Sequence, residues 1–361
     1  MIRLIFLLRS GLRVLDRSSR LLVPLSALLL LSGCSSLGYY SQLASGQWHL
    51  LQAREPVAEI IADPARDATL RKHLAQAEQA RAFASTQLKL PDNRSYRVYA
   101  DIGRPFVVWN VFATPEFDLE PLTHCFPVAG CVAYRGYYSQ SAARGAAALA
   151  RQQGQDVYIG GVQAYSTLGW FDDPILSSMM GWGDERLATL IFHELAHQRV
   201  YVKDDTEFNE SFATFVEQEG TRQWRKARNL PPLQDSASQQ RDQFTGLVLA
   251  SRERLKALYA EPLAVPAKRA AKAAEFERLR REYRALRDTA WGGVGRFDAW
   301  VESPLNNAKL LPFGLYDQWV PAFAALFKQV NGDWTAFYAA AEAWGRLPPV
   351  QRKQALVNAS H

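Results

Sequence analysis

Hydrophobic residues recur at helical spacing in three parts of the chain and at strand spacing in one. Residues 37–90, 184–220 and most of the chain beyond 236 carry apolar side chains every three or four positions, as amphipathic helices do. Between 95 and 159 the chain instead has short runs rich in aromatic and β-branched residues, separated by turn residues, which is typical of strands. These runs are SYRVYA, FVVWNVFA, CVAYRGYYS and DVYIGG.

The pattern predicts an α+β protein with a small mixed β-sheet and mainly helical N- and C-terminal parts. We expect a single domain that starts at residue 34. Its successive parts are a helical N-terminal part, a sheet with two site helices, a helical hairpin and a helical C-terminal part, over 34–90, 91–220, 221–290 and 291–361. The second helix of the hairpin, KRAAKAAEFERLRREYRALRD, is heavily charged. This favours a solvated structural arm over a partner-binding surface.

The first 33 residues have the pattern of an export signal. Five arginines precede the apolar run 21–31, which is too short to cross a bilayer comfortably. The sequence LSGC at 31–34 resembles the bacterial lipobox, which implies a lipoprotein signal peptide over 1–33 and lipidation at Cys34. Ser35 follows instead of the aspartate that retains lipoproteins at the inner membrane, so we expect an outer-membrane anchor with the protein facing the periplasm. The alternative is an uncleaved anchor with an incidental cysteine.

Charge and cysteine content bear on partners and compartment. The 361-residue chain has a formal charge of +6, and removing the five arginines and one aspartate of the signal lowers it to +2. The composition therefore gives no argument for a nucleic-acid partner. Cys125 and Cys131 are expected to form a disulfide in an oxidising compartment. His124 lies beside Cys125, so a metal site there is the alternative.

Two of the six histidines, His193 and His197, lie in the sequence HELAH. Asp184 is expected to cap a helix over residues 185–200. In a helix, residues four positions apart lie one above the other on the same face, so both imidazoles can bind one Zn²⁺ ion at about 2 Å. Glu194 is offset by one position and can accept a proton from a water molecule. This is the HExxH pattern of zinc peptidases.

A second helix supplies the candidates for a third zinc ligand. Asp204 and Glu207 have the spacing of a capping box, which predicts a helix that starts beside them. Glu210 lies in its second turn, in the sequence NESFA, where it can face His197 across a short loop. Glu207 and Glu217 share roughly the same face and stay as alternatives, with Glu210 favoured.

HELAH followed by NESFA resembles the gluzincin metallopeptidases, which include thermolysin and the alanyl aminopeptidases, although the separation here is shorter. More closely, the chain resembles a family of bacterial putative aminopeptidases that often carry a lipoprotein signal. The resembling segments are CFPVAGCVAYRGYY, GGVQAYSTLGWFDDP, HELAHQRVYVKDDTEFNESFATFVEQEG and SPLNNAKLLPFGLY. The resemblance implies a zincin-like catalytic domain with one Zn²⁺ ion held by His193, His197 and Glu210. It implies Glu194 as the base that activates water.

The resemblance implies three further features of the site. The first is an edge strand that binds the substrate backbone, for which GGVQAYSTLGWFDDP is the expected counterpart, or else an ordinary strand and turn. The second is an oxyanion donor, a His or Tyr in gluzincins. The other four histidines have no motif support, so Tyr165 and Tyr316 are the candidates. The third is an acidic group for the free amine of an aminopeptidase substrate, with Asp172, Asp173 and Glu207 as candidates.

These observations predict a zinc-dependent peptidase, an aminopeptidase by resemblance, that acts on peptides and is attached to the membrane by its lipid. One alternative is an endopeptidase acting on envelope proteins or peptidoglycan-linked peptides. The other is a non-enzymatic lipoprotein with a structural metal, whose hairpin or aromatic-rich C-terminal part binds a partner. Glu194 argues against this second alternative, because a structural metal site has no need of a base.

Overall fold

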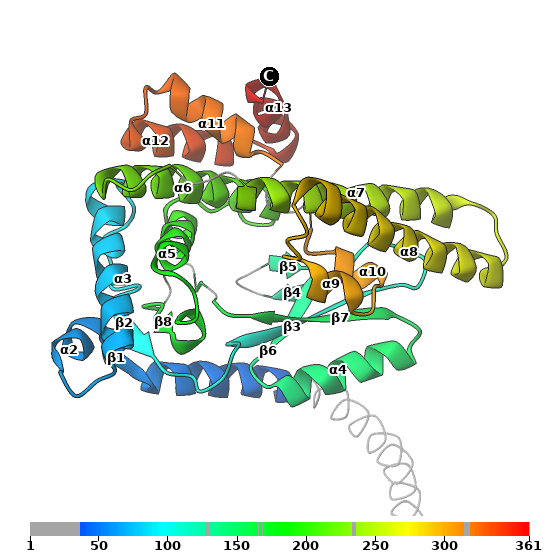
Figure 1. Ribbon diagram of the computed structural model, residues 1–361, viewed down its shortest axis with the longest axis horizontal. Helices are drawn as coiled ribbons and strands as arrows, with labels where there is room; N and C mark the ends of the chain where they lie inside the picture. The colour runs from blue at the N-terminus through cyan, green and yellow to red at the C-terminus, as the bar shows by residue number, and fades with distance from the viewer. Residues whose placement is uncertain are drawn as a thin grey trace, which may run out of the picture. The chain divides into compact units, whose positions relative to one another are not determined.

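The computed structural model describes residues 37–126, 130–164, 166–167, 169, 171–232, 236–313 and 318–360. The chain divides into two compact units, Met1–Gln52 and Ala53–His361, and each is described by itself. The described part of the first unit is a single helix over residues 37–52. The second unit holds all the other helices and strands labelled in Figure 1. Cys34, Tyr165 and Tyr316 lie outside the described residues.

The strands of the second unit form three small sheets, where the sequence predicted a single mixed sheet. In the first sheet, β2 (Val98–Ala100) pairs with β1 (Arg54–Pro56) in antiparallel and with β8 (Ile175–Leu176) in parallel orientation. In the second, β3 (Val108–Thr114) lies between β6 (Tyr134–Tyr137) and β7 (Asp156–Val162), both antiparallel to it. β4 (His124–Phe126) and β5 (Gly130–Val132) form a hairpin. The strands fall into separate sheets because β2 and β3, although consecutive, pair with different strands and not with each other in the described part of the chain.

Two helices of the second unit, α5 (Asp184–Arg199) and α6 (Thr206–Ala227), pack against each other, and α3 (Ala68–Thr86) packs on α5 (Figure 1). The shorter elements around them are α2 (Val57–Ala62), α4 (Gln140–Gln152) and a 3₁₀ turn at Ser177–Met179. The cap of α5 is Gly183, and not Asp184 as the sequence predicted. The Asp184 carboxylate instead lies 2.5 Å from Nδ1 of His73 on α3, which fixes the start of α5 to a neighbouring helix.

The C-terminal part supplies a layer of aromatic side chains to α6. It consists of α11 (Val320–Gln329), α12 (Trp334–Gly345) and α13 (Pro349–Ala359). The ring of Phe212 on α6 lies 5.5 Å from that of Phe323 and 5.8 Å from that of Phe337. Figure 1 shows α11 and α12 on the side of α6 opposite α5, so α6 is packed between two layers. Among the described residues, no helix has both the length and the apolar character needed to cross a membrane.

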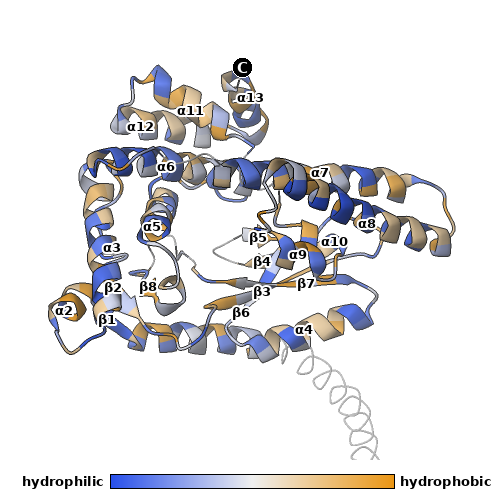
Figure 2. Ribbon diagram, in the orientation of Figure 1, coloured by the Kyte–Doolittle hydropathy of each residue, from blue (hydrophilic) through white to orange (hydrophobic). Residues whose placement is uncertain are grey.

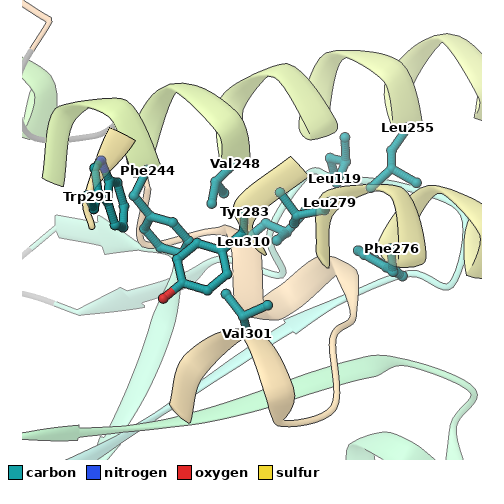
Figure 3. Close-up of a cluster of buried hydrophobic side chains, with 10 residues drawn as sticks. All are labelled: Leu119, Phe244, Val248, Leu255, Phe276, Leu279, Tyr283, Trp291, Val301 and Leu310. Atoms are coloured by element: carbon teal, nitrogen blue, oxygen red, sulfur yellow. The ribbon is translucent and has the colours of Figure 1, made fainter. Parts of the chain in front are cut away.

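The hairpin of α7 (Ser236–Ala260) and α8 (Val265–Ala290) has its own hydrophobic core, shown in Figure 3. Side chains from both helices pack there with α9 (Asp298–Glu302), α10 (Asn307–Leu310) and the residues beside them. The buried members are Leu119, Phe244, Val248, Leu255, Phe276, Leu279, Tyr283, Trp291, Val301 and Leu310. Figure 2 shows hydrophilic residues along much of α8, where ion pairs such as Arg254 with Glu282 and Arg284 with Glu302 lie. The inner face of the hairpin is therefore occupied by the protein itself.

Asn307, in the segment SPLNNAKLLPFGLY, joins the hairpin to the antiparallel sheet. Its side chain is fully buried. Nδ2 donates to the carbonyls of Glu116 (3.0 Å) and Asp118 (2.9 Å), while Oδ1 accepts a hydrogen bond from the Tyr259 hydroxyl of α7 (2.7 Å). The backbone N–H donates to Asp156 of β7 (2.8 Å). This segment, which carries part of the family resemblance, therefore contains a structural junction.

Candidate metal centre

Helix α5 holds HELAH by burying one side of its surface. Leu187, Ile191 and Leu195 are almost completely inaccessible to solvent, so the rotation of the helix is fixed by its core contacts. His193 and His197 then lie one turn apart, with ring centroids 4.7 Å from each other and ring planes at 83°. Their Nε2 atoms are 3.1 Å apart and point to the same place. The sequence prediction that the two imidazoles share one face is thereby met in the structure.

Helix α6 brings Glu210 to the same place. Its cap is Asp205, whose side chain accepts a hydrogen bond from the N–H of Phe208, so Glu210 falls in the second turn. Oε2 of Glu210 is 3.4 Å from Nε2 of His193, and Oε1 is 3.7 Å from Nε2 of His197. Among the described residues, these three form the group of side chains that could hold a metal ion.

The separations between these atoms suit a tetrahedral zinc ion. Ligands bound at about 2.0–2.1 Å in tetrahedral geometry lie about 3.3–3.4 Å from one another. The observed separations of 3.1, 3.4 and 3.7 Å fall on both sides of that value. Two imidazoles and one carboxylate are also the donor set of many catalytic zinc sites, which leave the fourth position for water or substrate. The residues present therefore fit Zn²⁺.

Glu217 contacts His193 from the other side of its ring. Oε2 of Glu217 lies 2.9 Å from Nδ1 of His193, about two turns along α6 from Glu210. A carboxylate on Nδ1 holds the proton there and leaves Nε2 free to bind a metal. Glu217 is therefore placed as a partner of a ligand and not as a ligand itself. The other alternative, Glu207, is exposed to solvent.

The three ligand candidates influence one another electrostatically. Burial lowers the pKa of His193, but hydrogen bonds with Glu210 and Glu217 outweigh this and raise it well above its usual value. Burial and the neighbouring His193 charge lower the pKa of His197 to about 4, so this imidazole is neutral, which is the form that binds metal. Nδ1 of His197 is buried and has no hydrogen-bond partner among the described residues. Burial raises the pKa of Glu210, but the hydrogen bond with His193 and the charges of both histidines lower it by more. The resulting pKa is below the usual value of a glutamate.

Glu194 lies in the same turn of α5 as the two histidines but is not part of their hydrogen bonds and ion pairs. It forms no hydrogen bond or ion pair with any of the described residues, unlike Glu210 and Glu217. Burial raises its pKa to about 7, opposed by the charge of His193 and reinforced by those of Glu210, Asp173 and Glu217. A carboxylate that lies beside the site without a fixed partner is placed as a base would be.

Asn209 fixes the loop between the two site helices. Its Oδ1 accepts a hydrogen bond from the N–H of Val202 (2.7 Å), and its Nδ2 donates to the carbonyl of the same residue (2.7 Å). The side chain, which is 3% exposed, thus pairs with both backbone groups of one residue. Because Asn209 precedes Glu210, this pairing sets the start of α6 relative to the end of α5. The sequence did not indicate this role.

Tyr201 lies in that loop and was also not indicated by the sequence pattern. Its side chain is 44% exposed. Partial burial and the charges of Glu210 and Asp204 raise the pKa of its hydroxyl. The signal that could have found it is its place in the short loop between the two site helices, directly after the C-terminal cap of α5.

The loop before α5 is held by Asp173. This carboxylate is 2% exposed and accepts hydrogen bonds from the N–H and hydroxyl of Thr167, with the Ser166 hydroxyl 3.4 Å away. Burial raises its pKa, and these hydrogen bonds oppose the rise. Asp172 instead forms a 3.4 Å ion pair with Arg94. Of the candidates for a free amine, Asp173 is therefore engaged by its own loop, and neither Asp172 nor the exposed Glu207 is in contact with the metal group.

The segment expected to form a substrate-binding edge strand, GGVQAYSTLGWFDDP, is a strand over only part of its length. Its first residues, 160–162, end β7, an outer strand of its sheet. The described residues between 163 and 174 contain no strand. The turn held by Asp173 explains this, since its hydrogen bonds fold the backbone back on itself.

Cys125 and Cys131 form a disulfide between β4 and β5, which leaves no thiolate for a metal site with His124. The hairpin lies against the loop between α5 and α6. Gly130 has φ of +72°, and a Cβ atom at this position would lie 2.1 Å from Oδ1 of Asp204. The N–H of Cys131 points to the same oxygen (3.4 Å). Only glycine fits this contact, which ties the hairpin to the metal-site loop.

The structure thus defines a mainly helical α+β protein with small sheets and a His-His-Glu group consistent with a metal site of the HExxH type. The model of the putative aminopeptidase family matches residues 38–356, and the chain belongs to this family. The sequence prediction of the family is confirmed. No curated protein and no solved structure was found to be similar to the chain.

Proposed function

We propose that this protein is a zinc-dependent peptide hydrolase with a zincin-like catalytic domain, and that it acts as an aminopeptidase. The observation that carries the proposal is the convergence of His193, His197 and Glu210 beside Glu194, a carboxylate with no partner among the described residues. Membership of the putative aminopeptidase family supports a peptide substrate. The buried inner face of the hairpin weakens the alternative that the hairpin is a binding surface.

The chain's own residues supply the proton transfers. His193, His197 and Glu210 would hold the ion, with Glu217 orienting His193. When bound, zinc supplies a Lewis acid that makes water a nucleophile at neutral pH and polarises a carbonyl. Glu194 accepts a proton from the attacking water as the new C–O bond forms, and donates it to the leaving amine nitrogen as the C–N bond breaks. Water is consumed, and an acid and an amine are released.

Stabilisation of the oxyanion needs a donor beside the metal. Tyr165 and Tyr316 remain our candidates from the sequence. We add Tyr201, because it directly follows the C-terminal cap of α5 and lies in the short loop that joins His197 to the helix of Glu210. The acidic group for a free amine is not assigned.

We further propose that the chain is lipid-anchored at Cys34 in the outer membrane and faces the periplasm. The basic and apolar N-terminus with its LSGC sequence supports this, and so does the disulfide, since disulfides persist in oxidising compartments. Fatty-acid labelling of the wild-type chain and of Cys34→Ser tests it. Label in both chains, or in neither, would contradict the anchor.

The experiment that tests the enzyme is elemental analysis of a soluble chain starting at Ser35, beside its His197→Ala variant. We expect about one zinc per chain, lost in the variant. A folded wild-type protein that retains no zinc after loading would refute the proposal. Hydrolysis of matched peptides with free and acetylated N-termini then separates an aminopeptidase, which needs the free amine, from an endopeptidase, which does not.

A further inference from the structure

The helix over residues 37–52 contains no charged side chain. From 21 to 53 the sequence has no Asp, Glu, Lys or Arg at all, and the charge-free stretch includes the whole helix. Helices on the surface of soluble proteins carry charged and polar residues on the face turned to water. The absence of charge is therefore unusual for a helix with exposed positions.

The exposed positions of this helix include its large apolar side chains. Leu37 is 72% exposed, Tyr40 48% and Trp48 59%, and Ala44 is also exposed. At about 100° per residue, these four positions fall within an arc of about 80° on one side of the helix. We call them the apolar stripe. Tyr39 and Leu50 are buried and lie on a different side of the helix, so the stripe is distinct from its buried side.

The side chains of the stripe suit a lipid headgroup layer. Tryptophan and tyrosine have an apolar ring and one polar group, and they are enriched where membranes meet water. The rest of the helix offers neutral polar residues such as Ser41, Gln42 and His49. A helix that lies in the interface buries its apolar face about 5–10 Å deep. Without charged residues, its attraction to the membrane would not depend on anionic lipids.

The position of the stripe in the chain points to the same partner. Leu37 is three residues after Cys34. Three residues span at most about 11 Å, so a lipid on Cys34 would hold the start of the helix at the bilayer surface. This step rests on the proposed lipid anchor, whereas the exposure of the stripe does not. We propose that the stripe of Leu37, Tyr40, Ala44 and Trp48 lies in the headgroup layer of the membrane.

The test uses the full chain, reconstituted in vesicles of phosphatidylethanolamine and phosphatidylglycerol. A nitroxide label is placed at Trp48→Cys in the stripe or at His49→Cys, its exposed neighbour about 100° round the helix. We expect the label at 48 to be severalfold more accessible to oxygen, which dissolves in lipid, than to a water-soluble nickel chelate. The label at 49 should show the reverse. Ala44→Cys should behave like 48.

Three results would overturn the proposal. Equal accessibility to the nickel chelate at 48 and 49 would place the stripe in water. Protection of 48 from both reagents would mean that protein covers it. Loss of lipid contact in about 1 M salt, where charge interactions are screened, would mean that charges elsewhere hold the helix in place. Fatty-acid labelling of the same chain separates the two proposals, because a lipidated chain with a water-exposed stripe refutes the stripe alone.

Discussion

Oε2 of Glu217 lies 2.9 Å from Nδ1 of His193, on the side of the ring opposite the atom that faces Glu210. This contact fixes the tautomer and the orientation of one ligand candidate. We predict that Glu217→Gln lowers zinc affinity about 10- to 100-fold, as loss of such a partner does, while the fold is kept. Competition with a chelator measures this affinity. Glu207→Gln is the control, because it makes the same change on the same helix at an exposed position. Equal affinities in the two variants would contradict the role of Glu217.

The roles of Glu210 and Glu217 were not equally predictable. His193 and His197 follow from spacing within one helix, because four residues make about one turn whatever surrounds it. Glu210 follows from a short loop between two helices. Which nitrogen of His193 meets Glu217 depends on how α6 is rotated against α5, and α6 is held on its other side by aromatic residues from α11 and α12. Those contacts join residues more than a hundred positions apart, and no local pattern contains them.

Glu194 should be separable from metal binding. We predict that Glu194→Gln keeps the zinc content of the wild type but lowers kcat at least about 10²-fold, because the amide cannot accept the proton of water. Elemental analysis and peptide hydrolysis on the same sample measure both properties. Glu261→Gln, an exposed position outside both site helices, serves as the control and should retain wild-type kcat. A zinc-loaded Glu194→Gln chain with wild-type turnover would remove Glu194 from the mechanism.

The oxyanion donor can be sought with three conservative substitutions. Tyr165→Phe, Tyr201→Phe and Tyr316→Phe each remove one hydroxyl and keep the ring. We predict that one of them lowers kcat about 10²- to 10³-fold without loss of zinc, as removal of one oxyanion donor does, and that the others change it little. Steady-state kinetics at saturating zinc distinguishes them. Wild-type kcat in all three would show that the donor is not one of these tyrosines.

Asn209 links stability to the metal site. We predict that Asn209→Ala lowers the free energy of unfolding by about 2–3 kcal/mol, because the N–H and carbonyl of Val202 both lose their partner. Urea unfolding in the presence of a chelator measures this effect without zinc. Zinc affinity should also fall, since Glu210 follows directly in the chain. A variant that is destabilised but binds zinc as tightly as the wild type would show that the hydrogen bonds between Asn209 and Val202 do not position Glu210.

The segment SPLNNAKLLPFGLY illustrates a limit of prediction from the sequence. Its resemblance to the family was visible, but its role was not, because Asn307 bonds to carbonyls about 190 residues earlier in the chain. The division into three sheets also depends on distant residues. β2 pairs in parallel with β8, although β3 to β7 lie between these two strands in the sequence. Contacts of this kind depend on the complete fold. Helices and short strands could be read from their periodicity, whereas their partners could not.

Asn307 should therefore matter to stability and not to the metal. Asn307→Ala leaves the carbonyls of Glu116 and Asp118 and the Tyr259 hydroxyl without a buried partner. We predict a loss of about 3 kcal/mol in the free energy of unfolding, within the range for unsatisfied buried groups. Zinc affinity at a temperature where the variant is folded should be unchanged, because Asn307 lies in α10, at the junction of the hairpin and the sheet, and not in α5 or α6. Asn358→Ala, at an exposed position, controls for the substitution itself. Weaker zinc binding in folded Asn307→Ala would instead mean that the hairpin junction and the metal centre are coupled.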